Sequence, residues 1–226
     1  MSTEAIKKAV GHKAAEYVEN GMRIGLGTGS TTFFFIQRIA ERCREGLKVQ
    51  AVASSEESKK LAQQGGIPLL NIDEITTLDL TVDGADEVDP QKRLIKGGGG
   101  AHVREKIVAA MSRELIIIVD ESKLVPALGK RKLPVEVVPF AYKSTLHHIA
   151  KAGYRGEFRL EKSGQIHVTD NGNFLIDIHF PAPLKNPEEV HETLIRIPGV
   201  VDTGFFFNLA GRIIVGFNDG QVVVKP

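Results

Sequence analysis

The chain has 226 residues, and its 29 Lys and Arg nearly balance its 28 Asp and Glu, for a formal net charge of +1. This length can bury one large or two small cores without disulfides, and the lack of a charge block argues against a nucleic-acid partner. No apolar run approaches the roughly 18 residues that span a bilayer, and Glu4, Lys7 and Lys8 stand where a signal peptide would be apolar. We therefore expect a cytoplasmic protein without a membrane partner. The single cysteine, Cys43, has helical spacing to neighbouring isoleucines and is expected to be a small core residue.

The first half of the chain alternates helical and strand-like segments. Apolar residues at helical spacing predict helices, and short apolar runs between turns predict strands. Strands that alternate with helices indicate a doubly wound, mostly parallel α/β sheet with helices on both faces, a Rossmann-like domain. The expected helices are residues 4–19, 32–44, 56–64 and 101–112, and the expected strands are residues 22–26, 48–53, 78–82 and 115–119.

The second half changes character near residue 130, where prolines become frequent. Its segments are expected as strand 135–138, helix 144–151, strands 157–160 and 174–180, helix 187–196 and strand 200–207. This β-α-β-β-α-β order is the ferredoxin-like split motif, which predicts a smaller α+β domain. A hairpin over 212–224 is expected to return to the first sheet. We therefore assign residues 1–130 plus 208–226 to the Rossmann-like domain and 131–207 to the ferredoxin-like domain.

A glycine-rich turn, Gly25 to Thr31, joins a predicted strand to a predicted helix. Backbone N–H groups and hydroxyls at a helix N-terminus can receive an anion, so this turn is a candidate phosphate site. It is not a dinucleotide fingerprint, because Ser30 replaces the third glycine and Ser54-Ser55 stand where an acid is needed, and it lacks the lysine of a P-loop. A glycine turn that serves only close packing remains the alternative.

An acidic turn, Asp83-Gly84-Ala85-Asp86-Glu87, follows the strand predicted at 78–82. Open α/β sheets bind ligands at the carboxyl ends of their strands, where carboxylates can hydrogen-bond sugar hydroxyls. The pattern is not an EF-hand, because its sixth position is Val88 and not glycine, and no metal site is predicted. A solvated acidic turn remains the alternative.

A glycine run, Lys96 to Gly100, leads into the helix predicted at 101–112. Glycines let the backbone approach a ligand closely, and ordering four of them costs conformational entropy, which disfavours a mere spacer. Glu105, in the first turns of the helix, can point back over the loop as a general base. The alternative is a solvated charged face formed with Arg104 and Lys106.

Together these motifs resemble a known family. The segments 27–31, 83–87, 96–99 with 104–106, and 120–123 occur as in ribose-5-phosphate isomerase of the A type, which the chain resembles over its whole length. Four ordered motifs are more specific than any one of them. The resemblance implies interconversion of D-ribose 5-phosphate and D-ribulose 5-phosphate in the pentose phosphate pathway, with no cofactor or metal, by a homodimer or homotetramer.

Site residues follow from the resemblance by matching motif. Glu105 is implied to be the catalytic base. The other implied contacts are Lys7, Thr28, Gly29, Ser30 and Thr31 for the phosphate, Asp83, Gly84, Ala85 and Asp86 for sugar hydroxyls and ring opening, and Lys96, Gly97, Gly98, Gly99 and Lys123 for the reacting end. His102 stands where small or apolar residues are commoner, which leaves open a difference in local pKa or packing.

The chemistry of an aldose-ketose isomerase agrees with these residues. One carboxylate must carry a proton between adjacent carbons while donors stabilise an enediolate oxygen, and Glu105 suits the first task, Lys96 and the glycine N–H groups the second. Two other functions stay open: an amino-sugar phosphate isomerase-deaminase on the same scaffold, and a sugar-phosphate sensor. A sensor would need a DNA-binding domain, for which we expect no room before residue 25.

Overall fold

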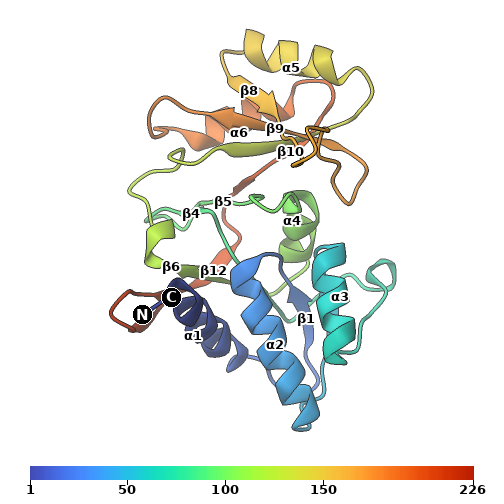
Figure 1. Ribbon diagram of the computed structural model, residues 1–226, viewed down its shortest axis with the longest axis vertical. Coiled ribbons are helices and arrows are strands. Elements are labelled where there is room, and N and C mark those ends of the chain that lie inside the picture. The colour runs from blue at the N-terminus through green and yellow to red at the C-terminus, as the bar shows by residue number, and fades with distance from the viewer. The chain divides into compact units, whose positions relative to one another are not determined.

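The computed structural model describes all residues, Met1–Pro226. Contacts divide the chain into two compact units, which are described separately (Figure 1). The first unit comprises Met1–Ala85, Arg104–Leu124 and Asn208–Pro226, and the second comprises Asp86–Val103 and Val125–Phe207. None of the helices has the length and apolar character needed to cross a membrane.

The first unit is built on a six-stranded sheet with the order β13-β12-β6-β3-β1-β2. All neighbours from β12 to β2 are parallel, and only β13 is antiparallel. This is the mostly parallel α/β sheet that the alternating pattern predicts, and the last hairpin joins it as expected. The strands are β1 (Arg23–Leu26), β2 (Gln50–Ala53), β3 (Leu80–Asp83), β6 (Leu115–Asp120), β12 (Ala210–Gly216) and β13 (Val222–Lys225).

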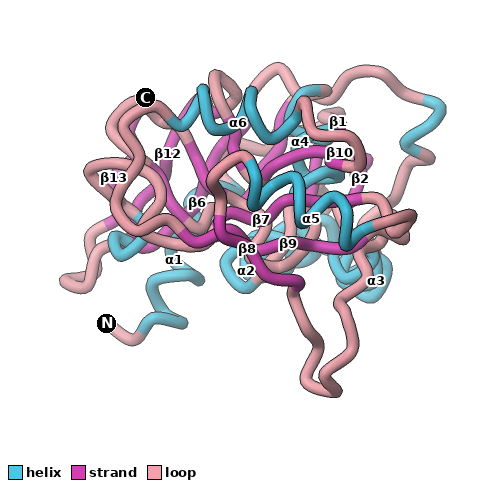
Figure 2. Tube along the Cα trace, turned by 90° about the horizontal axis from the view of Figure 1, so that it is seen from above, coloured by secondary structure: helices cyan, strands magenta, loops and turns pink.

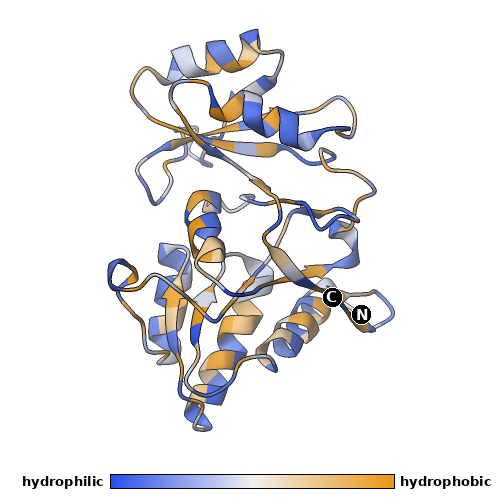
Figure 3. Cartoon of the chain, turned by 180° about the vertical axis from the view of Figure 1, so that it is seen from behind, coloured by the Kyte–Doolittle hydropathy of each residue, from blue (hydrophilic) through white to orange (hydrophobic).

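Helices cover both faces of this sheet, because successive strand residues point to opposite faces. Ile24, Leu26 and Val82 face the larger apolar cluster, under α1, α2 and α3. Val52 and Val108 belong to a smaller cluster on the other face, under α4. Figure 3 shows the helices as hydrophobic along one side and hydrophilic along the other. The helices are α1 (Thr3–Ala15), α2 (Ser30–Arg44), α3 (Glu56–Gly65) and α4 (His102–Ala110), of which α4 belongs to this unit from Arg104 on.

The second unit contains a four-stranded antiparallel sheet with the order β10-β7-β9-β8. With the chain order β7-α5-β8-β9-α6-β10, this is the predicted ferredoxin-like motif. Figure 2 shows α5 and α6 over the strands, and Ile149 of α5 and Leu194 of α6 pack into one cluster with the sheet. The elements are β7 (Leu133–Val137), α5 (Tyr142–Lys151), β8 (Arg155–Phe158), β9 (Phe174–His179), α6 (Pro187–Ile195) and β10 (Val200–Thr203).

A small antiparallel sheet, β11-β5-β4, also belongs to the second unit. Its strands are β4 (Glu87–Val88), β5 (Leu94–Ile95) and β11 (Phe205–Phe206). The strand expected over 200–207 is interrupted between β10 and β11 at Gly204, whose carbonyl accepts a hydrogen bond from Lys96 N at 2.8 Å. A Cβ at Gly204 would lie 2.3 Å from the Lys96 carbonyl oxygen, so this close crossing needs glycine.

The pairing of β5 with β11 affects where the chain divides into its two compact units. It groups residues 86–103 with the second unit, whereas the prolines near residue 130 predict a later boundary. Residues 125–130 also belong to the second unit, where Val125 N donates to Val88 O at 2.9 Å. The assignment of residues 1–130 plus 208–226 to one folding domain stays a prediction.

Candidate active site

The turn between β1 and α2 has the geometry of an anion site. Gly29 is the N-cap of α2 with a φ of 107°, and Ser30 and Thr31 begin the helix, so their N–H groups belong to its unsatisfied first turn. Gly29 and Ser30 are exposed, and Thr31 is half-buried. Lys7 of α1 donates from Nζ to Ser30 Oγ at 2.8 Å. A cation, two hydroxyls and a helix N-terminus therefore meet in one place.

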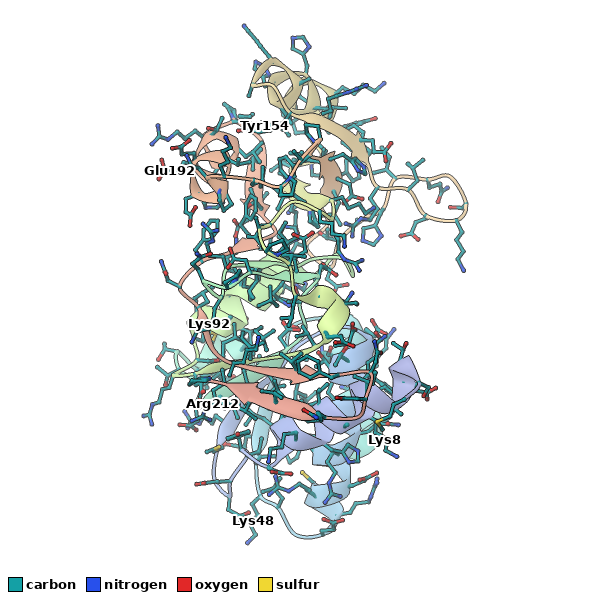
Figure 4. All side chains as sticks on the ribbon, turned by 90° about the vertical axis from the view of Figure 1, so that its left-hand side faces the viewer. Lys8, Lys48, Lys92, Tyr154, Glu192 and Arg212 are labelled. Atoms are coloured by element: carbon teal, nitrogen blue, oxygen red, sulfur yellow. The ribbon has the colours of Figure 1, made fainter.

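Close packing of α1 against α2 brings Lys7 to this turn. Gly11, four residues after Lys7 and thus on the same side of α1, has no room for a side chain, since a Cβ would lie 2.8 Å from Phe35 N. An open pocket of about 510 Å³ lies beside the turn. Lys8, which directly follows Lys7 on α1, is exposed (Figure 4). The residues lining the pocket are Thr3, Glu4, Lys7, Gly29, Ser30, Phe33, Phe34 and Glu57.

Thr28 differs from the three residues after it because it is buried. Its Oγ1 lies 2.8 Å from Ser54 Oγ and 2.8 Å from Ser55 Oγ, at the start of α3. Ser58 Oγ donates to the Gly27 carbonyl at 2.5 Å. Hydroxyls thus occupy the position where a dinucleotide site would carry an acid, and they tie the phosphate turn to α3.

Asp83 connects the phosphate turn to the end of β3. It is 1% exposed, and its Oδ1 accepts hydrogen bonds from Thr28 N at 3.1 Å and from Gly84 N at 2.7 Å. A Cβ at Gly27 would lie 2.2 Å from Asp83 Cγ, so only glycine fits beside this carboxylate. Gly84 and Ala85 follow at the same sheet edge and are half-buried.

Helix α4 runs antiparallel to the strands that it covers. At its carboxyl end, the Met111 carbonyl accepts from Leu78 N at 2.8 Å, just before β3 begins. One turn earlier, Val108 packs so tightly on β1 that a Cβ at Gly25 would lie 2.6 Å from Val108 Cγ1. The same Cβ would lie 1.9 Å from Thr81 Oγ1. The amino end of α4 therefore lies toward the carboxyl edge of the sheet.

Glu105 precedes Val108 by three residues, one helical turn nearer that edge. It is therefore at the level of the strand ends, and it is 4% exposed. Thr81 of β3 and Val108 of α4 meet at the same position of Gly25, so Thr81 is on the face that α4 covers. Asp83 is two residues further along β3 and is therefore on that face too. The neighbour of Glu105, Arg104, instead donates to the half-exposed Glu56 at 3.3 Å. Glu105 is thus separated from the charged outer face of α4, which is the environment expected of a general base.

Lys123 lies after β6, whose carboxyl end is at this same edge because β6 is parallel to β3. It closes a 3-10 helix, Glu121–Lys123, and is half-buried. Asp120 caps that helix by accepting from Ser122 N at 3.0 Å. In the first unit, the eight expected contact residues other than Lys7 thus gather with Lys7 around the carboxyl ends of β1, β3 and β6.

The remaining expected site residues, Asp86 and Lys96 to Gly99, belong to the second unit. Lys96 is buried, and its Nζ lies 5.4 Å from the centre of the Phe206 ring, a cation-π contact. Residues 97–100 form a tight turn closed by a hydrogen bond from Gly100 N to Gly97 O at 2.9 Å. Asp86 Oδ2 accepts from Gly98 N at 2.7 Å, so the second acid of the acidic turn binds the glycine turn.

His102 is a packing residue of the glycine turn. It is fully buried, and its Nε2 lies 3.4 Å from the Asp202 carbonyl. A Cβ at Gly97, whose φ is 98°, would lie 2.9 Å from His102 Cβ, so both the backbone conformation and the histidine require glycine there. The structure contains no group of three or more His, Cys, Asp or Glu side chains that could hold a metal ion.

Comparison with known proteins agrees with the motifs. The family model for ribose 5-phosphate isomerase A (phosphoriboisomerase A) matches residues 50–220. The chain belongs to this family. Ribose-5-phosphate isomerase A of Protochlamydia amoebophila is 47% identical over 218 residues, which cover 96% of this chain and 94% of that protein. The Bacillus mycoides enzyme is 49% identical over 215 residues, 95% and 97% of the two chains.

Solved structures of the family share the fold. Ribose 5-phosphate isomerase A of Methanocaldococcus jannaschii superimposes with a TM-score of 0.92 at 41% identity and covers 99% of both chains. A D-ribose-5-phosphate isomerase in complex with phospho-erythronic acid gives a TM-score of 0.94 at 38% identity, covering 100% of this chain and 99% of that one. The resemblance predicted from the motifs and the fold class are therefore confirmed, and the chain is an isomerase of the ribose 5-phosphate isomerase A family.

Two groups of site-supporting residues are not predicted from the sequence. From the sequence, Ser54 and Ser55 indicate only the lack of a dinucleotide acid and Ser58 carries no prediction, although a serine cluster after a strand could have indicated a hydroxyl network. Arg159 binds the glycine turn from a position about sixty residues away in the chain, and nothing in its neighbouring sequence marks it.

Proposed function

We propose that this isomerase interconverts D-ribose 5-phosphate and D-ribulose 5-phosphate. The observation that carries the proposal is that two features share one sheet edge: the exposed N-terminus of α2, where Lys7 of α1 binds Ser30, and the buried carboxylate of Glu105. A phosphate suits the first feature, and proton transfer suits the second. A family member has been solved with phospho-erythronic acid, a ligand that also joins a phosphate to a polyhydroxy chain.

Glu105 is the proposed base. It removes the proton from C2 of the open-chain aldose, the electron pair of that C–H bond forms the C1=C2 double bond, and negative charge develops on O1. Return of the proton to C1, with transfer of the O2 proton to O1, gives the ketose. The step needs no oxidant or reductant because the two carbons exchange oxidation levels.

The other proposed roles follow the family motifs. Gly29, Ser30 and Thr31 bind the phosphate together with Lys7, and Thr28 contributes mainly by holding the turn in shape, because its hydroxyl and its N–H both bond within the protein. The remaining contacts comprise the hydroxyl-binding and ring-opening group, Asp83, Gly84, Ala85 and Asp86, and the reacting-end group, Lys96, Gly97, Gly98, Gly99 and Lys123. Lys96 and the glycine N–H groups would stabilise the enediolate oxygen.

Isotope exchange tests the proposal against its two alternatives. In D2O, the protein should convert D-ribose 5-phosphate to D-ribulose 5-phosphate that carries deuterium at C1. Glucosamine 6-phosphate should release no ammonia, whereas ammonia release would favour an isomerase-deaminase. Tight binding of ribose 5-phosphate without turnover would contradict catalysis and favour a sensor.

The family assignment also supports a place in metabolism and an assembly. We propose that the reaction serves the pentose phosphate pathway in the cytoplasm and that the enzyme is a homodimer or homotetramer. Light scattering of the purified protein measures the assembly directly, and a monomer at micromolar concentration would contradict it.

A further inference from the structure

One arginine of the second unit holds the peptide groups of the glycine turn. Arg159 directly follows β8, and its side chain is 12% exposed. Its Nη1 donates to the carbonyl oxygen of Gly97 at 3.0 Å and to that of Gly98 at 3.1 Å. A single guanidinium therefore fixes two consecutive peptide planes in a segment of four glycines, which would otherwise have wide conformational freedom.

The guanidinium is itself anchored on a buried carboxylate. Arg159 Nε donates to Asp177 Oδ2 at 3.0 Å, Nη2 donates to Oδ1, and the Asp177 side chain of β9 is 2% exposed. Lys132 Nζ also donates to Asp177 Oδ2. Burial alone would raise the pKa of Asp177, but the hydrogen bonds from Arg159 and Lys132 hold that pKa below its ordinary value. Asp177 thus stays ionised at neutral pH and fixes the arginine by a bidentate pair.

The orientation of the carbonyls determines the orientation of the amides. All peptide bonds are trans, so the C=O and N–H of one peptide group point in opposite directions. Because the Gly97 and Gly98 carbonyls are bound to Arg159, the N–H groups of Gly98 and Gly99 point away from it. Gly98 N accordingly donates to Asp86 Oδ2 at 2.7 Å. Gly99 is exposed, and its N–H has no acceptor within the protein.

We propose that Arg159 is a positioning residue of the isomerase, which orients the glycine turn so that the Gly99 N–H donates to the oxygen that becomes negative during the reaction. This inference rests on the proposed function, which assigns the glycine turn to the reacting end of the sugar. In this role Arg159 acts through the carbonyls of Gly97 and Gly98 and not by contact with the substrate. Donors aimed at developing charge act more strongly in the transition state than in the ground state, so loss of the orientation lowers kcat more than it raises KM.

Arg159→Ala and Arg155→Ala form a test and its control. Arg155 is exposed on β8, four residues away, and has no role in the turn. We expect Arg159→Ala to lower kcat on the order of 10²-fold, the loss typical of a small misplacement of reacting groups, while KM and the Ki of inorganic phosphate change less than about threefold. Arg155→Ala should keep the wild-type kcat. A kcat within threefold of wild type in Arg159→Ala would overturn the proposal.

Two further measurements separate positioning from a general loss of folding. Guanidinium chloride at low, non-denaturing concentration should restore part of kcat in Arg159→Ala, since it can occupy the vacated position, and it should not stimulate the wild type. If Arg159→Ala does not fold, the double variant Arg159→Met, Asp177→Asn removes the unpaired buried charge and should fold with the same low kcat. Wild-type kcat in that folded double variant would overturn the proposal.

The outcomes also distinguish this inference from the proposed function. If the wild-type protein turns over ribose 5-phosphate and Arg159→Ala keeps a near-normal kcat, the proposed function stands and the positioning role is rejected. A wild-type protein that binds sugar phosphates without turning them over would overturn both.

Discussion

The buried carboxylate of Asp83 accepts a hydrogen bond from the backbone N–H of Thr28 at 3.1 Å, which ties the end of β3 to the phosphate turn. The same oxygen accepts the N–H of Gly84 at 2.7 Å. Two motifs that are far apart in the sequence therefore form one structural piece. Asp83 supports the shape of the turn in addition to any contact that it makes with the sugar.

Asp83→Ala should destabilise the fold, whereas Asp83→Asn should cost much less. Alanine leaves the buried N–H of Thr28 and the half-buried N–H of Gly84 without this acceptor, and each loss of a buried hydrogen bond costs about 1 to 3 kcal/mol. Asparagine keeps a carbonyl oxygen that can accept both. Urea denaturation measures the free energies of unfolding, and equal values for the two variants would contradict this role of the carboxylate.

Gly29→Ala and Gly46→Ala are a matched pair at opposite ends of α2. Their φ angles are 107° and 108°, and an added Cβ would meet no atom within 4 Å at either position. Both variants should therefore lose a similar free energy of unfolding, roughly 1 to 2 kcal/mol. Only Gly29→Ala should raise KM for ribose 5-phosphate, because its methyl group enters the anion site. A similar KM in both variants would place the phosphate elsewhere.

The sequence predicts long elements well because their apolar period is repeated several times. The helix expected at 56–64 is found at Glu56–Gly65, and the strand expected at 115–119 is found at Leu115–Asp120. The helix expected at 4–19 ends at Ala15, because the next residues bond three positions back, as from Val18 N to the Ala15 carbonyl at 3.2 Å. Strands β4 and β5 have two residues each, too few to show any period.

The site is predictable where glycines and charges cluster in the sequence, and not where it depends on distant partners. The three turns that carry Ser30, Asp83 and Lys96 are evident from composition alone. That Thr28 is buried by serines of the next βα connection, or that Arg159 binds Gly97, depends on tertiary packing, for which one sequence contains no local signal.

Lys7→Gln should raise KM for ribose 5-phosphate, and Lys8→Gln should not. Lys7 bonds to Ser30 at the phosphate turn, while Lys8 is exposed and makes no such contact. A charged hydrogen bond contributes about 1.5 to 3 kcal/mol, so KM should rise about tenfold or more with kcat little changed. Steady-state kinetics at low and high salt measure this, and an equal effect of both lysines would indicate a diffuse field and not a contact.

Turnover should survive dialysis against a chelator. The described side chains bring together no group of three or more metal ligands, and Lys96 with the glycine N–H groups can stabilise an enediolate oxygen. Activity before and after dialysis should therefore agree within error. A loss that magnesium or manganese restores would contradict this prediction and make Asp83 and Asp86 candidate ligands.

Glu105→Gln should abolish most catalysis and leave substrate binding intact. Glutamine keeps the size and hydrogen-bonding reach of the side chain but cannot take up the C2 proton as a carboxylate. General-base catalysis contributes about 10²- to 10⁴-fold, so kcat should fall by at least roughly two orders of magnitude, with little change in the Ki of inorganic phosphate. Glu56→Gln is the control, because it removes the half-exposed partner of Arg104 and should leave kcat unchanged.

Exchange of the C2 proton with solvent decides which group is the base. If Glu105 transfers the proton, the glutamine variant should lose this exchange in proportion to kcat, since enediolate formation itself is blocked. Loss of turnover with near-normal exchange would mean that the enediolate still forms and that Glu105 acts in a later step. The base would then be Asp83 or Asp86. Because Asp83 is buried and its Oδ1 already accepts two backbone N–H groups, whereas Asp86 is half-buried and accepts one, Asp86 would be the first of the two to test.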